Sequence, residues 1–214
     1  MLTSPTLELE TTLKAAGVKL VAGVDEAGRG AWAGPVVAAA VILPSELPEK
    51  TGINDSKQLS PAQRDELLVK IERLAVAIGV GVVEVDEVDR LGVAQATYVA
   101  MAKAIEGLKK KPDFILVDGF KVNFSQAPSS GIIDGDRKSM SIAAASIVAK
   151  VLRDRLMVDL HQKYPRFGFA IHKGYGTALH QERIAKHGIC GAHRKSFAPV
   201  KVVLRSKFTQ STLD

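Results

Sequence analysis

The chain has 214 residues, of which 46% are hydrophobic, and its formal net charge is +6. This apolar fraction is enough to fill the core of one α/β domain, and it excludes extended disorder. Cys190 is the sole cysteine, which excludes an internal disulfide and a cysteine-based zinc site. The basic balance favours an anionic partner such as nucleic acid.

The apolar pattern predicts neither a membrane protein nor a secreted one. Residues 1–10 contain acidic side chains where a signal peptide has a basic stretch followed by an apolar run, so we expect no signal peptide. The longest apolar run, Val36 to Leu43, has the length of a buried strand and is too short to cross a bilayer. We therefore expect a cytoplasmic protein.

Strands are predicted mainly in the first part of the chain. Residues 20–24 and 36–43 are two apolar runs joined by a glycine-rich connection, which predicts a β-hairpin. A dinucleotide-binding loop is disfavoured, because a helix should follow its glycines directly. Residues 79–85, 114–117 and 132–133 predict three further strands.

Helices are predicted between the strands and after them. Residues 60–63 form a capping box with proline at the first helical position, and residues 88–108 predict a second helix that ends at a run of lysines and a proline. Residues 141–164 and 177–187 predict two later helices, whereas the tail beyond Phe197 is basic and weakly patterned. This order predicts an α/β fold in which helices flank a mixed sheet.

Acidic residues stand at the ends of several predicted elements. Asp25 and Glu26 follow the first strand, Asp118 follows the strand at 114–117, and Asp136 precedes the long helix. In an α/β sheet such strand ends bring distant side chains into one crevice, so Asp25 and Asp118 should lie close together if their strands are neighbours. Glu26 can join them only if the backbone bends, because successive strand residues face opposite ways.

A glycine-arginine loop, Gly28-Arg29-Gly30, follows the first acids. Its glycines allow the backbone to approach a phosphodiester closely, and Arg29 presents a charged fork to it. Carboxylate ligands in this number suit Mg²⁺ or Mn²⁺, and two such ions roughly 4 Å apart can support displacement at a phosphodiester. Taken singly, each acid also fits a solvated turn or a helix cap. Together with the loop, they predict a metal-dependent site that cuts or transfers phosphate.

Other polar residues carry less weight. The loop Asn54-Asp55-Ser56-Lys57 fits a solvated turn, and Lys150, Arg153 and Arg155 fit an exposed helix face. Trp32, the one tryptophan, fits simple packing after the glycine loop. The histidines show no two-ligand spacing joined to a catalytic glutamate, so we expect hydrogen-bonded or surface positions for all five (His161, His172, His180, His187 and His193).

With these motifs the chain resembles the bacterial ribonuclease HII family (type 2 ribonuclease H) over nearly all of residues 20–199. The resemblance rests on Gly23-Val24-Asp25-Glu26-Ala27-Gly28-Arg29-Gly30, Asn54-Asp55-Ser56-Lys57-Gln58-Leu59, Val117-Asp118-Gly119, Gly135-Asp136, Ile142-Ala143-Ala144-Ala145-Ser146-Ile147-Val148-Ala149-Lys150-Val151, His172-Lys173-Gly174-Tyr175-Gly176-Thr177 and His193-Arg194-Lys195-Ser196-Phe197. One short motif is weak support, but this many in order is specific. Ala31-Trp32 departs from the family, which usually has proline and a smaller apolar residue there, so we expect a looser loop.

The resemblance implies a fold and a set of site residues. It implies a single domain over 1–214, with a ribonuclease-H-like mixed sheet flanked by helices at 18–165 and a helical, basic substrate-binding segment at 166–214. It implies four catalytic, metal-binding acids and a set of substrate-binding residues (Asp25, Glu26, Asp118 and Asp136; Gly28, Arg29, Gly30, Ser56, Lys57 and Tyr175). Within the second set, the loop reads the 2′-hydroxyl largely through its backbone, and Tyr175 stacks on the sugar beyond the ribonucleotide.

The implied reaction is endonucleolytic cleavage of RNA in RNA–DNA hybrids, and 5′ of a single ribonucleotide in duplex DNA, with two Mg²⁺ or Mn²⁺ ions. It leaves 5′-phosphate and 3′-hydroxyl ends. The expected partners are those nucleic acids, bound with salt-dependent affinity by Arg29, Lys57 and the basic tail. We expect a monomer, and the tail shows no clear sliding-clamp peptide.

Two alternatives remain. One is a catalytically silent nucleic-acid-binding protein that is indifferent to chelator. The other is a nuclease of resolvase or integrase type, against which the Gly28-Arg29-Gly30 loop and Tyr175 argue.

Overall fold

The computed structural model describes residues 4–48, 51–119 and 122–210. The chain forms two compact units, of which the first comprises residues 1–27, 37–82 and 98–151 and the second comprises residues 28–36, 83–97 and 152–214. The single domain expected over 1–214, with its core at 18–165 and its C-terminal segment at 166–214, stays a prediction.

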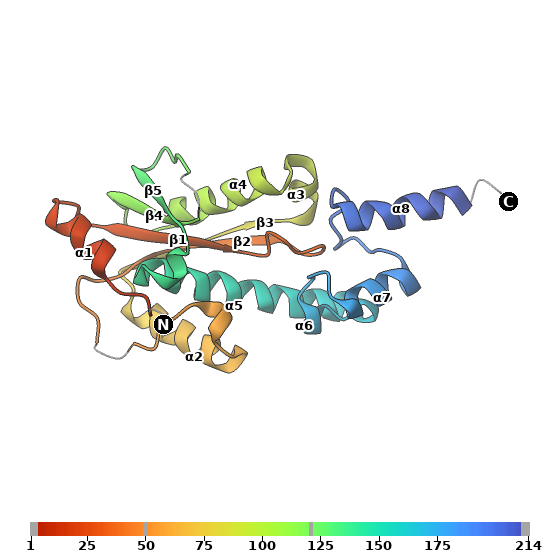
Figure 1. Cartoon of the computed structure of the whole chain (residues 1–214), viewed down its shortest axis with the longest axis horizontal. Coiled ribbons are helices and arrows are strands. Elements are labelled where there is room, and N and C mark those ends of the chain that lie inside the picture. Colours follow the sequence, from red (N-terminus) through yellow and green to blue (C-terminus); the bar gives the residue numbers. More distant parts are fainter. Residues whose placement is uncertain (1–3, 49–50, 120–121, 211–214) are drawn as a thin grey trace. The chain divides into compact units, whose positions relative to one another are not determined.

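A five-stranded mixed sheet lies almost wholly in the first unit (Figure 1). Its order is β3-β2-β1-β4-β5, and the strands are β1 (Val21–Ala27), β2 (Val36–Ile42), β3 (Ala77–Val83), β4 (Phe114–Asp118) and β5 (Ser129–Ile132). β1 is antiparallel to β2 and parallel to β4, and β4 is parallel to β5. The predicted hairpin is therefore confirmed, and the two acid-bearing strands are neighbours.

The register of β1 on β4 brings two acids to the same end of the sheet. Val24 pairs with Val117, so Asp25 and Asp118 are the next residues along two parallel neighbours. β1 continues as far as Ala27, so its acids belong to the strand, whereas the sequence predicted that they follow it. The longer strand results from the hairpin, because β2 pairs with β1 as far as Ala27.

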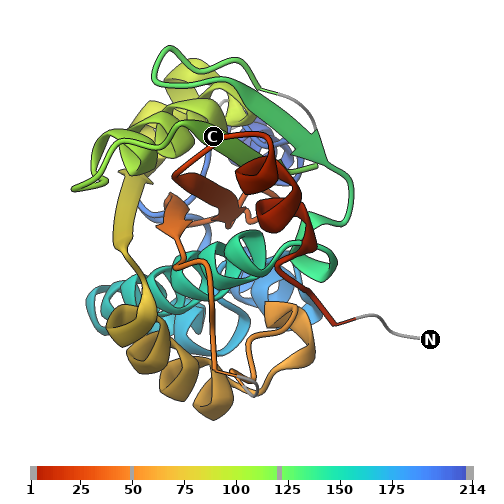
Figure 2. The ribbon, with the colours of Figure 1, turned by 90° about the vertical axis from the view of Figure 1, so that its left-hand side faces the viewer.

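Helices cover both faces of this sheet, as Figures 1 and 2 show. The first-unit part of α4 (Val93–Glu106) covers one face, and the N-terminal half of α5 (Met140–Lys163) covers the other. A Cβ on Gly81 would lie 2.0 Å from a carbonyl oxygen of α4, and one on Gly23 would lie 2.2 Å from the main chain of α5. Glycine at these two positions therefore allows the helices to approach the strands closely. The observed fold is the predicted mixed sheet with flanking helices.

The core of the first unit is built largely from small apolar side chains. All seven residues of β2 are buried. The first turns of α5 contribute a continuous buried set: Ile142, Ala143, Ala144, Ala145, Ile147, Val148 and Ala149. Removing such surface from water stabilises the fold by about 25 cal/mol per Å². The apolar first half of α5 thus fixes the helix against the sheet.

Two further helices, α1 (Glu8–Ala15) and α2 (Pro61–Leu74), complete the first unit. α2 begins with the predicted capping box, because Ser60 Oγ accepts from the Gln63 N–H and the Gln63 side chain accepts from the Ser60 N–H. It buries an apolar stripe at helical spacing, formed by Leu67, Leu68 and Ile71. α1 was not among the predicted elements.

The second unit is largely helical. It contains the C-terminal half of α5 and the helices α3 (Val85–Leu91), α6 (Phe169–His172), α7 (Ala178–His187) and α8 (Ala198–Gln210). The prediction of one helix over 88–108 is wrong, because α3 ends at Gly92, whose φ of 79° a continuous helix cannot contain. α7 has the predicted caps, Thr177 and Gly188. Within residues 4–48, 51–119 and 122–210, no helix combines the length and apolarity needed to span a membrane.

Candidate active site

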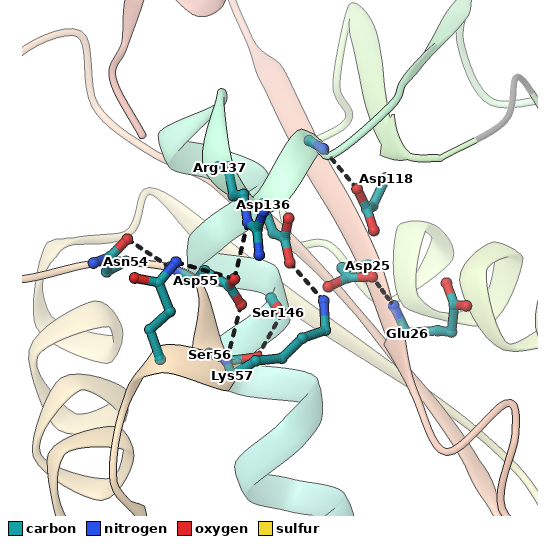
Figure 3. Close-up of polar contacts among 12 residues, drawn as sticks. Asp25, Glu26, Asn54, Asp55, Ser56, Lys57, Asp118, Asp136, Arg137 and Ser146 are labelled. Carbon is teal, nitrogen blue, oxygen red and sulfur yellow. Dashed lines mark hydrogen bonds and ion pairs between the residues drawn. The ribbon is translucent and has the colours of Figure 1, made fainter. Parts of the chain in front are cut away.

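Asp25, Asp118 and Asp136 lie together in the first unit (Figure 3). Asp25 and Asp118 come from neighbouring strands, and Asp136 comes from the 3-10 turn η2 (Gly135–Arg137). The Gly135 N–H donates to Asp118 Oδ1 at 2.7 Å, which ties this turn to the end of β4. Asp25 is 5% exposed and Asp136 is 3% exposed. The expectation that Asp25 and Asp118 meet is confirmed.

The crowding of these carboxylates changes their acidity. Burial raises the pKa of Asp25 well above its ordinary value, and the charges of Glu26 and Asp118 raise it further, whereas a hydrogen bond from Ser146 opposes the rise. Burial also raises the pKa of Asp118, and the charge of Asp136 is the second cause. A cation among these groups would relieve both their desolvation and their repulsion. The arrangement therefore favours a bound cation.

The Glu26 side chain points in a different direction from those of the other three acids, although its charge helps to raise the pKa of Asp25. Figure 3 shows its carboxylate pointing away from theirs, as alternation along a continuous strand requires. Its N–H donates to Asp25 Oδ1 at 2.7 Å, so the backbone links the two residues. The bend that the sequence required for Glu26 to join the cluster does not occur, since β1 continues through both positions.

Lys57 reaches the cluster as a cation. Its Nζ donates to Asp136 Oδ2 at 2.8 Å. Partial burial acts to lower the pKa of Lys57, but the hydrogen bond and charge of Asp136, with the charges of Asp25 and Asp55, raise it above its ordinary value. Lys57 is therefore charged at neutral pH and neutralises part of the acidic cluster.

A hydrogen-bonded network fixes the turn that carries Lys57. Asp55 caps the turn η1 (Ser56–Gln58) by accepting from the Lys57 N–H at 2.9 Å, and Arg137 Nε donates to Asp55 Oδ2 at 3.2 Å. Burial opposes ionisation of Asp55, but these hydrogen bonds hold its pKa below the ordinary value. Ser56 is buried, and its hydroxyl oxygen lies 2.9 Å from that of Ser146 on α5. Sequence reasoning assigned no role to Arg137 or Ser146, because their partners are distant in sequence.

The oxygen donors of this cluster fit a hard divalent cation. Carboxylate oxygens are the ligands that Mg²⁺ and Mn²⁺ prefer. Among the described residues, no group of three potential ligands already has a metal-binding geometry. Since Lys57 donates to Asp136 Oδ2, a divalent ion that takes this oxygen requires the lysine side chain to move away. Its exposure to solvent allows that movement.

The glycine-arginine loop lies in the second unit, and its tip is exposed. Gly28 has a φ of 89°, and its carbonyl oxygen accepts from the Ala31 N–H at 3.2 Å, which closes a tight turn. Arg29 and Gly30 are exposed, whereas Ala31 is buried. The charged fork and the backbone of Gly30 are therefore at the surface, whereas Gly28 is buried.

This loop packs against the segment that carries Tyr175, which is half-buried. The Trp32 N–H donates to the Gly174 carbonyl oxygen at 2.8 Å. A Cβ on Gly176 would lie only 2.3 Å from the Trp32 ring, so the indole packs directly on the backbone there. Trp32, at the departure from the family, thus packs on the Tyr175 segment, and the looser loop stays a prediction.

Arg153 is buried, whereas the sequence predicted an exposed position for it. Of the three basic residues expected on an exposed face of α5, Arg155 is exposed, Lys150 is half-buried and Arg153 is fully buried. Its guanidinium donates to main-chain carbonyl oxygens, among them that of Pro35, 118 residues earlier in the chain. The sequence predicted exposure from the charge of Arg153 alone. Its hydrogen-bond partners are distant in the chain and leave no pattern in the nearby sequence.

Three of the histidines form a buried cluster behind Tyr175 in the second unit. His172 Nδ1 accepts from the Gly174 N–H at 3.1 Å, and His180 Nδ1 lies 3.0 Å from the Tyr175 carbonyl oxygen. The Nε2 atoms of His180 and His193 lie 3.2 Å apart. Burial lowers the pKa of each of these two to about 4, so both are neutral at pH 7. They are hydrogen-bonded supports, as the sequence predicted.

A sequence model described as ribonuclease HII matches residues 22–200 of the chain. The chain belongs to the ribonuclease HII family. A ribonuclease HII from Geobacillus kaustophilus is 50% identical over 202 residues, covering 94% of this chain and 76% of that protein. Another, from Dehalococcoides mccartyi, is 51% identical over 199 residues, covering 92% of this chain and 94% of that protein.

Solved structures of related proteins share the fold. Ribonuclease H2 from Pyrococcus horikoshii matches with a TM-score of 0.73 at 29% identity, over 88% of this chain and 98% of that one. Ribonuclease HII from Archaeoglobus fulgidus, solved in a complex with PCNA, matches with a TM-score of 0.66 at 30% identity, over 82% and 94% of the two chains. As a member of the ribonuclease HII family, the protein is a hydrolase, a metal-dependent endoribonuclease of the ribonuclease H type that acts on RNA–DNA hybrids.

Proposed function

We propose that the protein cuts RNA within RNA–DNA hybrids and also cuts 5′ of single ribonucleotides embedded in duplex DNA, leaving 5′-phosphate and 3′-hydroxyl ends. These reactions would serve ribonucleotide removal and RNA primer processing. The observation that carries the proposal is the meeting of Asp25, Asp118 and Asp136 at one end of the sheet, where burial and repulsion raise the pKa of the first two.

The proposed metal ligands are Asp25, Glu26, Asp118 and Asp136, with Mg²⁺ or Mn²⁺ as the ions. Two divalent ions at such a site activate a water and stabilise the departing oxygen of the phosphodiester. Asp25, Asp118 and Asp136 already share one region, which supports their part in the set. Glu26 points away from them, so its part requires a side-chain rotamer different from the one in Figure 3.

The exposed loop tip is proposed to bind the ribonucleotide. The exposed backbone at Gly30 can approach a 2′-hydroxyl, the group that distinguishes RNA from DNA at a given position, and the proposed contact of the buried Gly28 requires the loop to adjust on binding. Arg29 is exposed and can contact phosphate, which positions a duplex without reading its sequence. Tyr175 is proposed to stack on the sugar beyond the ribonucleotide.

Ser56 and Lys57 are proposed to bind substrate in different ways. Lys57 has an exposed side chain that can move from Asp136 to a phosphate. Ser56 is buried against Ser146, and its carbonyl oxygen accepts from Arg64, so its proposed part in substrate binding is to hold the Lys57 turn in place. Both residues lie beside the acids in the first unit.

The decisive experiment uses an end-labelled duplex that contains one ribonucleotide. We expect a single cut 5′ of that ribonucleotide with Mg²⁺ or Mn²⁺ and no cut with chelator, and mapping of the ends should show 5′-phosphate and 3′-hydroxyl. An all-DNA duplex of the same sequence is the control. Cleavage of the all-DNA duplex would indicate a resolvase or integrase type of nuclease, and chelator-insensitive binding without cleavage would indicate a silent binding protein.

Two further properties are proposed from the sequence alone, namely that the protein acts as a monomer and in the cytoplasm. Analytical ultracentrifugation with and without duplex tests the first, because a monomer sediments with the mass of one chain at every concentration. Fractionation of cells that express the tagged chain tests the second.

A further inference from the structure

Two fully buried arginines, Arg153 and Arg194, lie beneath the loop in the second unit. Six of their hydrogen bonds end on main-chain carbonyl oxygens. Burial lowers the pKa of both, that of Arg194 to about 10, so both remain charged at neutral pH. A buried charge is tolerated only when its hydrogen-bond partners are held in place. The two guanidinium groups therefore order the backbone around them.

Arg194 orders the loop. Its Nε donates to the Gly34 carbonyl oxygen at 2.9 Å, its Nη1 to that of Arg29 at 3.0 Å and its Nη2 to that of Pro35 at 3.1 Å. One of these carbonyls belongs to the exposed tip, and the other two lie in the return toward β2. All three hydrogen bonds thus act within residues 29–35, and they fix the shape of the loop itself.

Arg153 joins the loop to the Tyr175 segment. Its Nε donates to the Pro35 carbonyl oxygen at 3.1 Å and its Nη2 to that of Ala33 at 3.2 Å, whereas its Nη1 donates to that of Lys173 at 3.0 Å. The same guanidinium carbon lies 5.2 Å from the centroid of the Tyr175 ring, within the range of a cation–π contact. One planar group therefore spans both segments.

We propose that Arg153 is a positioning residue for substrate selection, which sets the place of Tyr175 relative to the Gly28-Arg29-Gly30 loop. This inference rests on the proposed function, in which the loop binds the ribonucleotide and Tyr175 binds the sugar beyond it. The distance between those two contacts decides whether one isolated ribonucleotide is recognised. A continuous hybrid has a ribonucleotide at every position of its RNA strand, so its cleavage depends less on that distance.

The chemistry of the contact requires arginine. Guanidinium presents five N–H donors in one plane, whereas lysine has a single nitrogen whose three donors cannot reach three carbonyls spread around a plane. Gly28 leaves the space for this group, because a Cβ on Gly28 would lie 1.9 Å from Arg153 Nε. Gly28 therefore begins the turn whose tip is Arg29 and Gly30, and it also leaves room for the guanidinium.

The test measures kcat/KM on a duplex with one ribonucleotide and on a long hybrid, with the same divalent metal. We expect Arg153→Lys to lower the single-ribonucleotide rate about tenfold more than the hybrid rate, since misplaced contacts weaken recognition steeply. Arg194→Lys should lower both rates alike. Arg166→Lys, at an exposed position of the same unit, is the matched control and should leave the ratio of the two rates unchanged.

A double-mutant cycle with Tyr175→Ala separates positioning from general damage. If Arg153 acts through Tyr175, the ratio of rates for the double variant should equal that for Tyr175→Ala alone. Thermal unfolding of each variant establishes that it is folded. The proposal is overturned if folded Arg153→Lys keeps the wild-type ratio of the two rates. It is also overturned if the effects of Arg153→Lys and Tyr175→Ala on that ratio multiply independently.

A second variant keeps the test decisive if Arg153→Lys does not fold. Lys173 has a φ of 51°, a conformation that glycine adopts freely and other residues adopt at a cost. Lys173→Gly removes that cost and leaves the hydrogen bond from Arg153 to the carbonyl of residue 173 in place. A ratio that stays at the wild-type value supports Arg153 as the element that holds this segment. A folded Lys173→Gly protein in which the single-ribonucleotide rate falls relative to the hybrid rate contradicts it.

Failure of the proposed function has a different signature. A wild-type protein that cuts the hybrid but not the single-ribonucleotide duplex would overturn both the proposed function and this inference. A wild-type protein that cuts both, with a ratio indifferent to Arg153, would overturn the positioning role alone.

Discussion

The ammonium nitrogen of Lys57 lies 2.8 Å from a carboxylate oxygen of Asp136, although the lysine side chain is 72% exposed and that of the aspartate only 4%. The lysine thus reaches a buried acid from the surface. It neutralises part of a cluster in which the carboxylates of Asp25 and Asp118 are already difficult to ionise. A divalent ion and Lys57 are therefore alternative partners of Asp136 Oδ2.

Replacing this lysine should strengthen metal binding by the free protein. In Lys57→Met the competing charge is gone, so we expect Mn²⁺ to bind several-fold more tightly in the absence of nucleic acid, as measured by isothermal titration calorimetry. The effect should shrink at high salt, because the lysine is solvent-exposed. Lys110→Met, an exposed lysine between α4 and β4, is the control. Equal or weaker Mn²⁺ binding in Lys57→Met would show that the lysine does not compete.

Removing one proposed ligand should stop the chemistry and spare binding. We expect Asp25→Asn to lower cleavage by about a hundredfold or more, since metal stabilisation of the transition state is worth several kcal/mol. Binding of a labelled single-ribonucleotide duplex, measured by fluorescence anisotropy with Ca²⁺, should change little because it depends on phosphate contacts. Asp159→Asn, at an exposed site on α5, is the control. A fully active Asp25→Asn protein would remove the two-metal proposal.

The parts of the fold that carry local signals could be predicted from the sequence. The hairpin and the caps of α2 and α7 follow from glycine, proline and hydroxyl residues at fixed spacing. The meeting of Asp25 and Asp118 follows from one topological rule, that parallel neighbours deliver their ends to the same edge. Gly92 also carried a signal, since an isolated glycine inside a helical pattern can be a helix end.

Other features depend on contacts that no local pattern encodes. Arg153 is buried because carbonyl oxygens more than a hundred residues away in sequence accept its hydrogen bonds. The link from Ser56 to Ser146 crosses 90 residues. The direction of the Glu26 side chain depends on how far β2 extends the pairing of β1. Such facts become visible only once the chain is folded.

Glu10 offers a test of how the N-terminal helix stabilises the first unit. Its buried carboxylate accepts from the Ser139 hydroxyl at 2.6 Å and from the Ser141 N–H at 2.9 Å, at the N-terminus of α5. Losing these bonds leaves buried donors without their acceptor, so Glu10→Ala should lower the free energy of unfolding by about 1–3 kcal/mol. Urea unfolding at pH 7 measures this. Glu8→Ala, exposed on the same helix, should change little, and equal effects of the two substitutions would contradict the capping role.

The buried histidines should make the protein unstable to acid over a defined range. His180 and His193 have a pKa of about 4 in the folded protein, against an ordinary value of about 6.5. Below pH 6.5 the unfolded chain binds these protons and the folded chain does not, so stability is complete above pH 6.5 and falls as the pH drops toward 4. Each histidine contributes roughly 1.4 kcal/mol per pH unit within that range.

Removing one of these groups should therefore flatten the pH profile of stability. We expect His180→Gln to be less stable than wild type at pH 7.5, because its contact with the Tyr175 carbonyl is altered, but to lose less stability between pH 6.5 and 4.5. Urea unfolding across that range gives the slope. His187→Gln, at the half-buried C-terminal end of α7, is the comparison: burial and the charge of Lys186 also lower the pKa of His187, but its ring is less buried than those of His180 and His193, so the slope should flatten less. If His180→Gln keeps the wild-type slope, the acid lability comes from the carboxylates and not from this cluster.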